Sequence, residues 1–255
     1  MDFQALIYEK SEGIAVITMN RPDKLNPLSR LVFKEFNDCL DDADADKQVG
    51  AVIITGGDKV FCAGMDIAEM QSLKKEEIFS FWNEGYNKTF DRFYNFRVPT
   101  IAAISGYCLA GGFDLSISCD FRIATETARF AQLEVNVHLS PGIDRLWRLV
   151  GLSRAKYLGL TADTIDVKEA YRIGLVDKVV SVADLKKESR TLAAKFVAKP
   201  RKALEKTKQS YLKIGSLDHK AAMEWETSLL VELFDTEERR QIMDRFLNKQ
   251  RDKDR

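Results

Sequence analysis

Long hydrophobic runs are missing from this 255-residue sequence. A helix that crosses a membrane needs roughly 20 consecutive apolar residues, and no stretch of the chain approaches that length. The first residues, MDFQALIYEKSEG, have neither the apolar centre of a secretory signal nor the arginine content of a transit peptide. These absences predict a soluble protein, and we expect it in the cytoplasm.

An excess of one charge is also missing, because 39 Lys and Arg residues balance 39 Asp and Glu residues. A chain without net charge has no overall field that attracts nucleic acid or an anionic membrane. We therefore expect neither as a partner.

Cysteine and histidine are scarce, and their spacing does not suit a metal. No CxxC pair occurs, and neither His138 nor His219 lies close to a cysteine in the sequence. This spacing argues against a zinc site and a disulfide framework. Because neither histidine has a matching serine-bearing turn, a catalytic triad is also disfavoured. We expect no metal, and reduced thiols at Cys39, Cys62, Cys108 and Cys119.

The first half of the chain contains short apolar runs that alternate with helical patterns. Ala51–Thr55 and Thr100–Ile104 are predicted to be buried strands, since each is a mostly apolar run of strand length. Glu12-Gly13 lies between two further runs and predicts a hairpin. From Ser153 onward the pattern is almost wholly helical. We therefore predict an α/β fold, with a core over residues 1–195 and a helical region over residues 196–255.

Two helix boundaries are also predicted. Residues 76–96 form a long amphipathic pattern, and its helix should stop before Val98-Pro99, because the residue before a proline disfavours helix. Asn26 and Ser29 are candidate N-caps of an earlier helix. One face of that helix carries Leu31, Val32, Phe36 and Leu40.

A glycine-bearing segment, FCAGMD at residues 61–66, follows a predicted strand and precedes a helical pattern. Small residues let the backbone approach a ligand closely, and a helix start presents free N–H groups. An ordinary tight strand-to-helix turn would have the same composition, so this segment alone does not indicate a site.

A second glycine segment, GYCLAGGFD at residues 106–114, also follows a buried strand. It has neither the ending of a P-loop nor the GxGxxG spacing of a dinucleotide fold. The N–H of Gly111 would be uncapped at a helix start. Two such donors that converge on one oxygen form an oxyanion hole, worth roughly 3–4 kcal/mol per donor. Close packing of helix on strand would explain Gly112 equally well.

Two carboxylates lie near these segments. Asp114 belongs to the first turn of the helix that Gly111 begins, so it lies beside the candidate donors. The simpler interpretation of Asp114 is a charge that stabilises the start of its helix by only ~0.3–1 kcal/mol. Glu134 lies in the semi-apolar segment FAQLEV, where a lone glutamate is more often a surface residue.

Taken together, these segments resemble the crotonase family, the enoyl-CoA hydratases and isomerases. The resemblance covers nearly the whole chain, and it depends on several motifs that occur in order at matching separations. They are NRPDKLN at 20–26, FCAGMD at 61–66, residues 105–120, FAQLE at 130–134, Pro141-Gly142, AYRIGLV at 170–176 and FLNK at 246–249.

The resemblance implies a spiral of ββα turns and a C-terminal helical region that trimerises, giving a trimer or a dimer of trimers. It implies that the N–H groups of Met65 and Gly111 bind the oxygen of an acyl-CoA thioester, with no further cofactor. It places Lys24 near the CoA phosphates. The other implied CoA-binding residues are Cys62, Ala63, Gly64, Asp66 and Ile67, with Phe246 and Lys249 from a neighbouring subunit.

The same resemblance assigns roles to the two acids. Glu134 matches the glutamate that passes a proton to or from the substrate α-carbon. Asp114 matches a position where hydratases usually carry a second glutamate that holds water, and here it is shorter by one methylene. A further departure follows Pro141-Gly142, where a glycine-rich loop of many hydratases is shortened to IDRL. Since that loop borders the acyl pocket, the choice of acyl group stays open.

The leading interpretation is an enoyl-CoA hydratase that adds water to a 2-enoyl-CoA. The main alternative is a dienoyl-CoA or enoyl-CoA isomerase. The dienoyl-CoA isomerase pattern has acids matching Asp114 and Glu134 and a further aspartate where this chain has Gly142, although Asp144 is close by. A hydrolase or decarboxylase, a non-catalytic acyl-CoA or RNA-binding relative, and a serine protease of the same fold are weaker alternatives.

Overall fold

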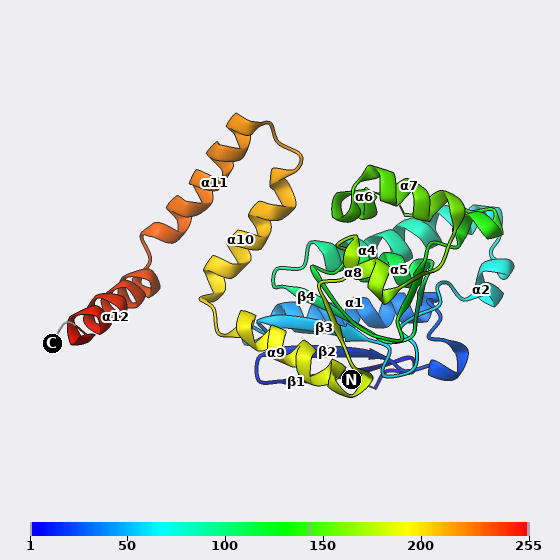
Figure 1. Cartoon of the computed structure of the whole chain (residues 1–255), viewed down its shortest axis with the longest axis horizontal. Coiled ribbons are helices and arrows are strands. Elements are labelled where there is room, and N and C mark those ends of the chain that lie inside the picture. Colours follow the sequence, from blue (N-terminus) through cyan, green and yellow to red (C-terminus); the bar gives the residue numbers. More distant parts are fainter. Residues whose placement is uncertain (1, 143, 254–255) are drawn as a thin grey trace. The chain divides into compact units, whose positions relative to one another are not determined.

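The computed structural model of the chain describes residues 2–142 and 144–253, with side chains through Asn248. The chain divides into two compact units, Met1–Ala198 and Lys199–Arg255 (Figure 1). The described strands all belong to the first unit. Among the described residues, no helix combines the length and the apolar character needed to span a membrane.

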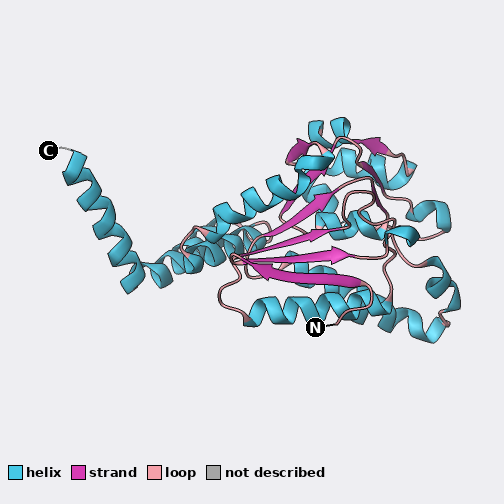
Figure 2. Ribbon diagram, turned by 90° about the horizontal axis from the view of Figure 1, so that it is seen from below, coloured by secondary structure: helices cyan, strands magenta, loops and turns pink. Residues whose placement is uncertain are grey.

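Two sheets organise the first unit (Figure 2). The larger contains β1 (Leu6–Ser11), β2 (Ile14–Met19), β3 (Ala51–Thr55), β4 (Thr100–Ile104), β6 (Phe121–Thr125) and β9 (Lys178–Val180), in that order. The smaller contains β5 (Tyr107–Leu109), β7 (Arg129–Ala131) and β8 (Ile165–Asp166).

Most neighbouring strands run parallel. In the larger sheet only β1 and β2 pair antiparallel, through the predicted hairpin, in which Glu12 and Gly13 have φ of 55° and 74°. Positive φ at both residues is the geometry of a two-residue hairpin turn. Each parallel pair requires a crossover connection, so segments distant in sequence meet at the ends of the strands.

The crossovers and the remaining helices surround these sheets. In the first unit they are α1 (Arg30–Ala45), α2 (Ile67–Ser72), α3 (Lys75–Ser80), α4 (Lys88–Tyr94), α5 (Gly111–Ile117), α6 (Asp144–Val150), α7 (Leu152–Thr161), α8 (Val167–Arg172) and α9 (Leu185–Val197). Short 3-10 turns occupy Pro22–Lys24, Glu134–Val137 and Val182–Asp184.

The central strands β3 and β4 of the larger sheet are buried on both faces, as predicted for their apolar runs. Successive side chains of a strand point to opposite faces. Ile53 of β3 therefore packs in one core cluster with Leu185 and Ala193 of α9. Its neighbour Ile54 packs in a separate, larger cluster with residues of α1.

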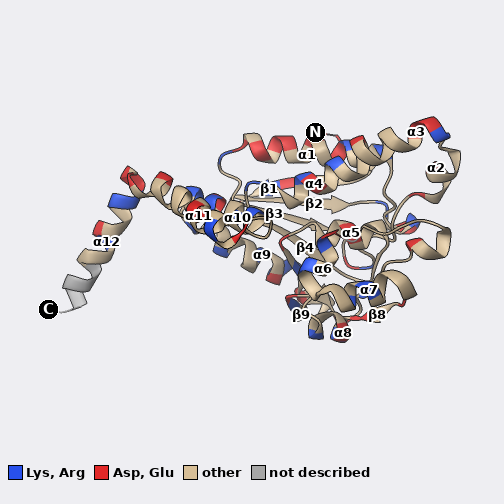
Figure 3. Cartoon of the chain, turned by 90° about the horizontal axis from the view of Figure 1, so that it is seen from above, with Lys and Arg blue, Asp and Glu red and all other residues tan. Residues whose placement is uncertain are grey.

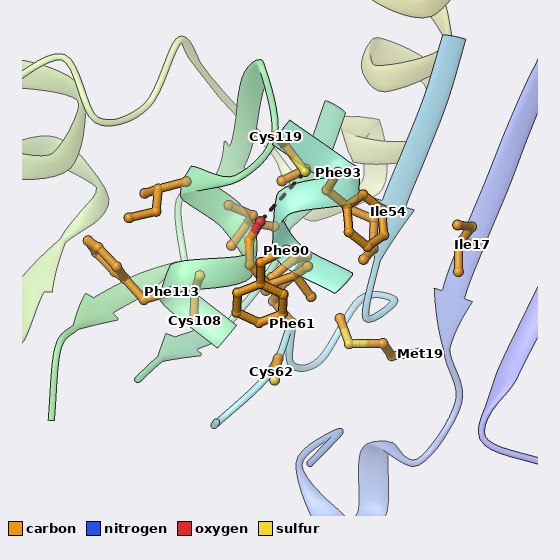
Figure 4. Close-up of a cluster of buried hydrophobic side chains, with 14 of the residues drawn as sticks. Ile17, Met19, Ile54, Phe61, Cys62, Phe90, Phe93, Cys108, Phe113 and Cys119 are labelled. Carbon is orange, nitrogen blue, oxygen red and sulfur yellow. Dashed lines mark hydrogen bonds between the residues drawn. The ribbon is translucent and has the colours of Figure 1, made fainter. Parts of the chain in front are cut away.

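The larger cluster extends beneath the glycine segments (Figure 4). Phe61 and Cys62 of the first segment and Cys108 and Phe113 of the second are fully buried in it. The backbones of both segments therefore rest on tightly packed side chains, which resist displacement.

Ser29 caps α1 as predicted, since its Oγ accepts a hydrogen bond from the N–H of Val32 at 3.3 Å. Asn26, the other candidate cap, does not cap α1. Its buried amide donates to the carbonyl oxygens of Gly56, Val60 and Phe61 at 3.0–3.2 Å. Leu31 was predicted on the buried face of α1, but it is 37% exposed, because it lies at the rim of the stripe that begins at Val32.

The long helix predicted over residues 76–96 is present but not uniform. A π-helical segment, Phe81–Asn87, joins α3 to α4, and the helical stretch ends at Tyr94, before the proline. A π turn contains more residues than an α turn, so it changes which side chains face the core.

The second unit is helical, with α10 (Arg201–Ile214), α11 (His219–Phe234) and α12 (Glu237–Lys253). Several of its large apolar side chains are exposed, among them Tyr211, Leu230, Val231 and Phe234. Acidic and basic residues are interspersed along the helices of the chain (Figure 3), consistent with its zero formal net charge.

Candidate active site

A cavity of about 1060 Å³ opens among five segments of the first unit. Predicted site residues that line it are Lys24, Ala63, Gly64, Met65, Asp66, Ile67, Gly111, Asp114 and Glu134. The structure therefore brings nine of the twelve predicted residues to one cavity.

The two glycine segments meet at the wall of this cavity. The N–H of Leu109 donates to the carbonyl of Cys62 at 2.9 Å, and Cys62 and Cys108 form an isolated parallel bridge. A Cβ added at Gly112 would lie 2.3 Å from the Cys62 carbonyl oxygen, so the packing requires glycine there. A Cβ added at Gly64, where φ is 110°, would lie 3.4 Å from the nitrogen of Gly111. The backbone around Met65 and the start of α5 are therefore neighbours.

Both candidate donors are available to a ligand. Among the hydrogen bonds between described residues, none uses the N–H of Met65 or Gly111 as its donor. Ala110, which precedes α5, has a φ of 47°, a conformation that costs a residue with a side chain roughly 1–3 kcal/mol. Its own N–H is held by the carbonyl of Ala131 at 2.8 Å, which fixes the orientation of the turn.

The other three predicted residues are Cys62, which does not line the cavity, and Phe246 and Lys249, which belong to the second unit. Cys62 is fully buried, and its thiol donates to the carbonyl of Gly64 and accepts from the N–H of the same residue at 3.4 Å. Phe246 belongs to α12 of the second unit and is 69% exposed. Lys249 also falls within α12, but its side chain lies outside the described residues.

Asp114 is buried in α5, only 3% exposed, and three donors hold its carboxylate. The hydroxyl of Tyr86 and the N–H of Gly142, the latter at 3.3 Å, both donate to Oδ2. The Nε2 of Gln132 donates to Oδ1 at 3.3 Å. Burial raises the pKa of Asp114 to about 6, and these hydrogen bonds and the charge of Arg145 oppose that rise.

Glu134 begins the 3-10 turn Glu134–Val137 and faces the same cavity. Burial, and then the negative charge of Asp114, raise its pKa to about 7. Its Oε2 is buried and has no hydrogen-bond partner among the described residues. Buried polar oxygens are normally bonded, so this oxygen is available to a group that enters the cavity.

The two acids therefore hold protons differently. Between the pKa of Asp114, about 6, and that of Glu134, about 7, the first is mostly ionised and the second mostly protonated. A pair with pKa values pushed apart can supply a base and an acid in one step.

Sequence reasoning missed three residues that complete the site. Tyr86 and Gln132 bond Asp114, and Trp82 lines the cavity beside Tyr86. The amphipathic pattern over residues 76–96 predicted only a long helix. Gln132 stands two residues before Glu134 in the FAQLE motif, which was the one available signal.

Metal ligands are not grouped in the described part of the chain. Among residues 2–142 and 144–253, no group of three or more His, Cys, Asp or Glu side chains is arranged to hold a metal ion.

Comparisons with known proteins agree with the resemblance seen in the sequence. The profile of the family described as "Enoyl-CoA hydratase/isomerase" matches residues 9–253. The chain is 39% identical to the short-chain-enoyl-CoA hydratase of Clostridium acetobutylicum over 255 residues, 98% of this chain and 97% of that protein. It is 38% identical to the crotonyl-CoA hydratase of Syntrophomonas wolfei, covering 98% of each chain.

Solved structures agree as well. The crystal structure of an enoyl-CoA hydratase from Bacillus anthracis superimposes with a TM-score of 0.92, at 29% identity, over 96% of this chain and 97% of that one. This similarity confirms the predicted α/β fold of the crotonase type. With the family profile matched along nearly its whole length, this chain belongs to the enoyl-CoA hydratase/isomerase family.

Proposed function

We propose that the chain is an enoyl-CoA hydratase that adds water across the α,β double bond of a short-chain 2-enoyl-CoA. The observation that carries the proposal is the pair Asp114 and Glu134, two buried acids of different pKa that face one cavity. The full-length relatives named as short-chain and crotonyl-CoA hydratases support it.

In the proposed reaction, ionised Asp114 takes a proton from water while the water oxygen bonds to the β-carbon. The electrons of the double bond move toward the thioester carbonyl, and protonated Glu134 delivers its proton to the α-carbon. One O–H bond, one C–O bond and one C–H bond form while one O–H bond of water, the π bond and the O–H bond of Glu134 break. Asp114 then holds the proton, and exchange with solvent restores the starting state. General acid–base help of this kind contributes roughly 10²–10⁴-fold.

The charge that develops on the thioester oxygen needs donors. The N–H groups of Met65 and Gly111 are our candidates, since both lack another acceptor among the described residues and their segments are in contact. Backbone donors fixed before the reaction stabilise such charge without reorganisation.

The rest of the cavity suits the CoA portion of the substrate. We assign Lys24 to the phosphates and residues 62–67 to the adenine, with contact made by residues 63–67, since Cys62 is fully buried and does not line the cavity. We assign Phe246 and Lys249 to CoA bound by a neighbouring subunit. A trimer or dimer of trimers would also cover exposed apolar side chains such as Leu230 and Val231.

The proposed reaction changes no overall oxidation state, so it requires no redox cofactor, and the substrate is itself the CoA thioester. The setting we propose is the cytoplasm, where free thiols stay reduced. All four cysteines are free and buried, in agreement with that setting.

An isomerase is the second candidate, because Asp114 and Glu134 could also move a double bond. A Cβ added at Gly142 would lie 3.0 Å from Oδ2 of Asp114, a tight contact that disfavours a third acid at this position. Asp144 does not replace it, since its side chain is 77% exposed and pairs with Arg148 at 3.3 Å. These contacts favour water addition over the three-acid isomerase pattern.

The test is to incubate the purified protein with a panel of 2-enoyl-, 3-enoyl- and dienoyl-CoAs and detect products by mass. We expect products heavier by one water from short 2-enoyl-CoAs. Rapid isomerisation of a dienoyl-CoA, with no hydrated product from any 2-enoyl-CoA, would overturn the proposal in favour of the isomerase.

A further inference from the structure

Tyr86 lies between the two halves of the candidate site. Its hydroxyl donates to Oδ2 of Asp114, and it lines the same cavity although only 9% of its surface is exposed. A Cβ added at Gly111 would lie 3.6 Å from Cε2 of Tyr86, the ring carbon next to the one that bears the hydroxyl. The phenol therefore lies close to the start of α5 and bonds the carboxylate one turn further on.

Aromatic neighbours fix the direction of that hydroxyl. Trp82 stacks on the ring with centroids 5.4 Å apart and planes at 15°. Phe90 lies 4.2 Å from it, and Phe33 meets it edge-on at 6.3 Å. A ring packed on several sides cannot turn its hydroxyl elsewhere without opening the core.

The π-helical segment Phe81–Asn87 creates this arrangement. One extra residue in a turn rotates the later residues of the helix by roughly 100° relative to a continuous α-helix. Gly85 allows the segment to approach α1, since a Cβ there would lie 2.9 Å from Cδ2 of Phe33. Single π turns occur often at functional sites.

The hydrogen bonds to Asp114 occupy most of the acceptor positions of its carboxylate. A carboxylate offers about four lone-pair positions. Tyr86 and Gly142 use two on Oδ2, and Gln132 uses one on Oδ1. One position remains for water, and it belongs to Oδ1.

We propose that Tyr86 is a positioning residue for water addition, whose hydroxyl orients the Asp114 carboxylate so that a single lone pair of Oδ1 is left to receive the proton of water. The inference rests on the proposed hydratase function and assigns a role to a residue outside the two acids and the two backbone donors.

The electrostatics agree with this role. The charged groups that act on Asp114 and Tyr86 across the cavity are Glu134 and Arg145. The bond from Tyr86 lowers the pKa of Asp114 against the opposing effect of burial. Burial, and then the charge of Asp114, raise the pKa of Tyr86 well above 10, so its hydroxyl stays a donor at working pH.

The test is Tyr86→Phe, which keeps the ring and removes the hydroxyl. We expect kcat for hydration to fall roughly 10- to 100-fold with KM changed less than about threefold. The acidic limb of kcat/KM should move up by about one pH unit, because the charged form of Asp114 loses a donor. Exchange of α-protons in a saturated acyl-CoA, which needs Glu134 and not Asp114, should change less than about threefold.

Tyr8→Phe is the matched control. Its hydroxyl donates to Oδ2 of Asp42 at 2.9 Å, in a part of the first unit outside the cavity. Loss of this similar Tyr–Asp bond should leave kcat, KM and both pH limbs unchanged. A double-mutant cycle adds a second test. If Tyr86 acts through Asp114, adding Tyr86→Phe to Asp114→Asn should cause little further loss of hydration.

Outcomes separate the two proposals. Unchanged hydration and an unmoved acidic limb in Tyr86→Phe, with active wild type, would overturn only the role of Tyr86. Equal losses of hydration and α-proton exchange, with additive effects in the cycle, would also overturn it and indicate a structural role. Wild type that yields no hydrated product contradicts the proposed function, and the inference falls with it.

Discussion

The two acids of the cavity have opposite surroundings. The Asp114 carboxylate is held by donors from α5's neighbours Tyr86, Gln132 and Gly142, whereas Oε2 of Glu134 has no partner among the described residues. A held carboxylate keeps one geometry, whereas a buried carboxyl oxygen without a partner favours the protonated form and can meet a substrate. This difference agrees with the proposed mechanism, in which Asp114 acts on water and Glu134 on carbon.

Glu134→Gln should give the largest effect, because it removes the group that we propose protonates the α-carbon. We expect hydration and α-proton exchange to fall together, each by roughly 10³–10⁴-fold. Hydration is measured as the product heavier by one water, and exchange as deuterium uptake from heavy water. If exchange persists in this variant, Glu134 is not the carbon acid.

Asp114→Asn should separate the two activities. Hydration should fall by roughly 10²–10³-fold, because the amide cannot take the proton of water. Exchange should stay within about tenfold of wild type, since Glu134 is intact. If hydration and exchange fall together in Asp114→Asn, as expected for Glu134→Gln, the two acids do not have different roles.

The pH dependence of hydration should sharpen the contrast. Below about 6 the rate should fall as Asp114 takes up a proton, and above about 7 it should fall as Glu134 loses one. Since the acids interact, the two limbs belong to the pair and report its singly protonated form. The reverse reaction, dehydration of the product, also requires the acid pair to carry one proton. The values of kcat/KM for hydration and for dehydration should therefore peak in the same pH window. A plateau from pH 5 to pH 9 would contradict the assignment.

The smallest expected effect is on stability. The pKa of Glu134 is raised from 4.5 to about 7 in the folded chain, so the unfolded chain ionises first and stability falls as pH rises through this window. Glu134→Gln has no carboxyl group to ionise at this position, so it does not lose this stability as the pH rises. At pH 8 its free energy of unfolding should exceed that of wild type by ~1–3 kcal/mol. Urea unfolding at pH 8 and pH 4 checks this, because the difference should vanish at the lower pH. A less stable variant at pH 8 would mean that ionised Glu134 is stabilised in the fold.

Some of these features were predictable from sequence, and others were not. Buried strands, the hairpin at Glu12-Gly13 and the Ser29 cap depend on patterns local to a few residues. The motifs placed Asp114 and Glu134 at one cavity, through the resemblance and not through spacing alone.

The features that the sequence did not predict involve contacts between distant segments. Asn26 had the composition of a cap but bonds carbonyls some thirty residues away. Tyr86 lies 28 residues from Asp114, and the π turn that orients it has the same apolar pattern as an α-helix. No local pattern specifies which side chain will satisfy a buried carboxylate, because that depends on packing.

The parallel order of the larger sheet has a consequence for how activity appears during folding. Pairing β2 with β3, β3 with β4 and β4 with β6 closes long loops before any stabilising contact forms, and such non-local topologies fold slowly. The cavity takes its walls from residues scattered between Lys24 and Gly142, so it exists only after these closures. A refolding chain can therefore regain helical signal well before turnover. Recovery of turnover, followed beside the tryptophan fluorescence to which Trp82 stacked on Tyr86 contributes, would time the last step of assembly.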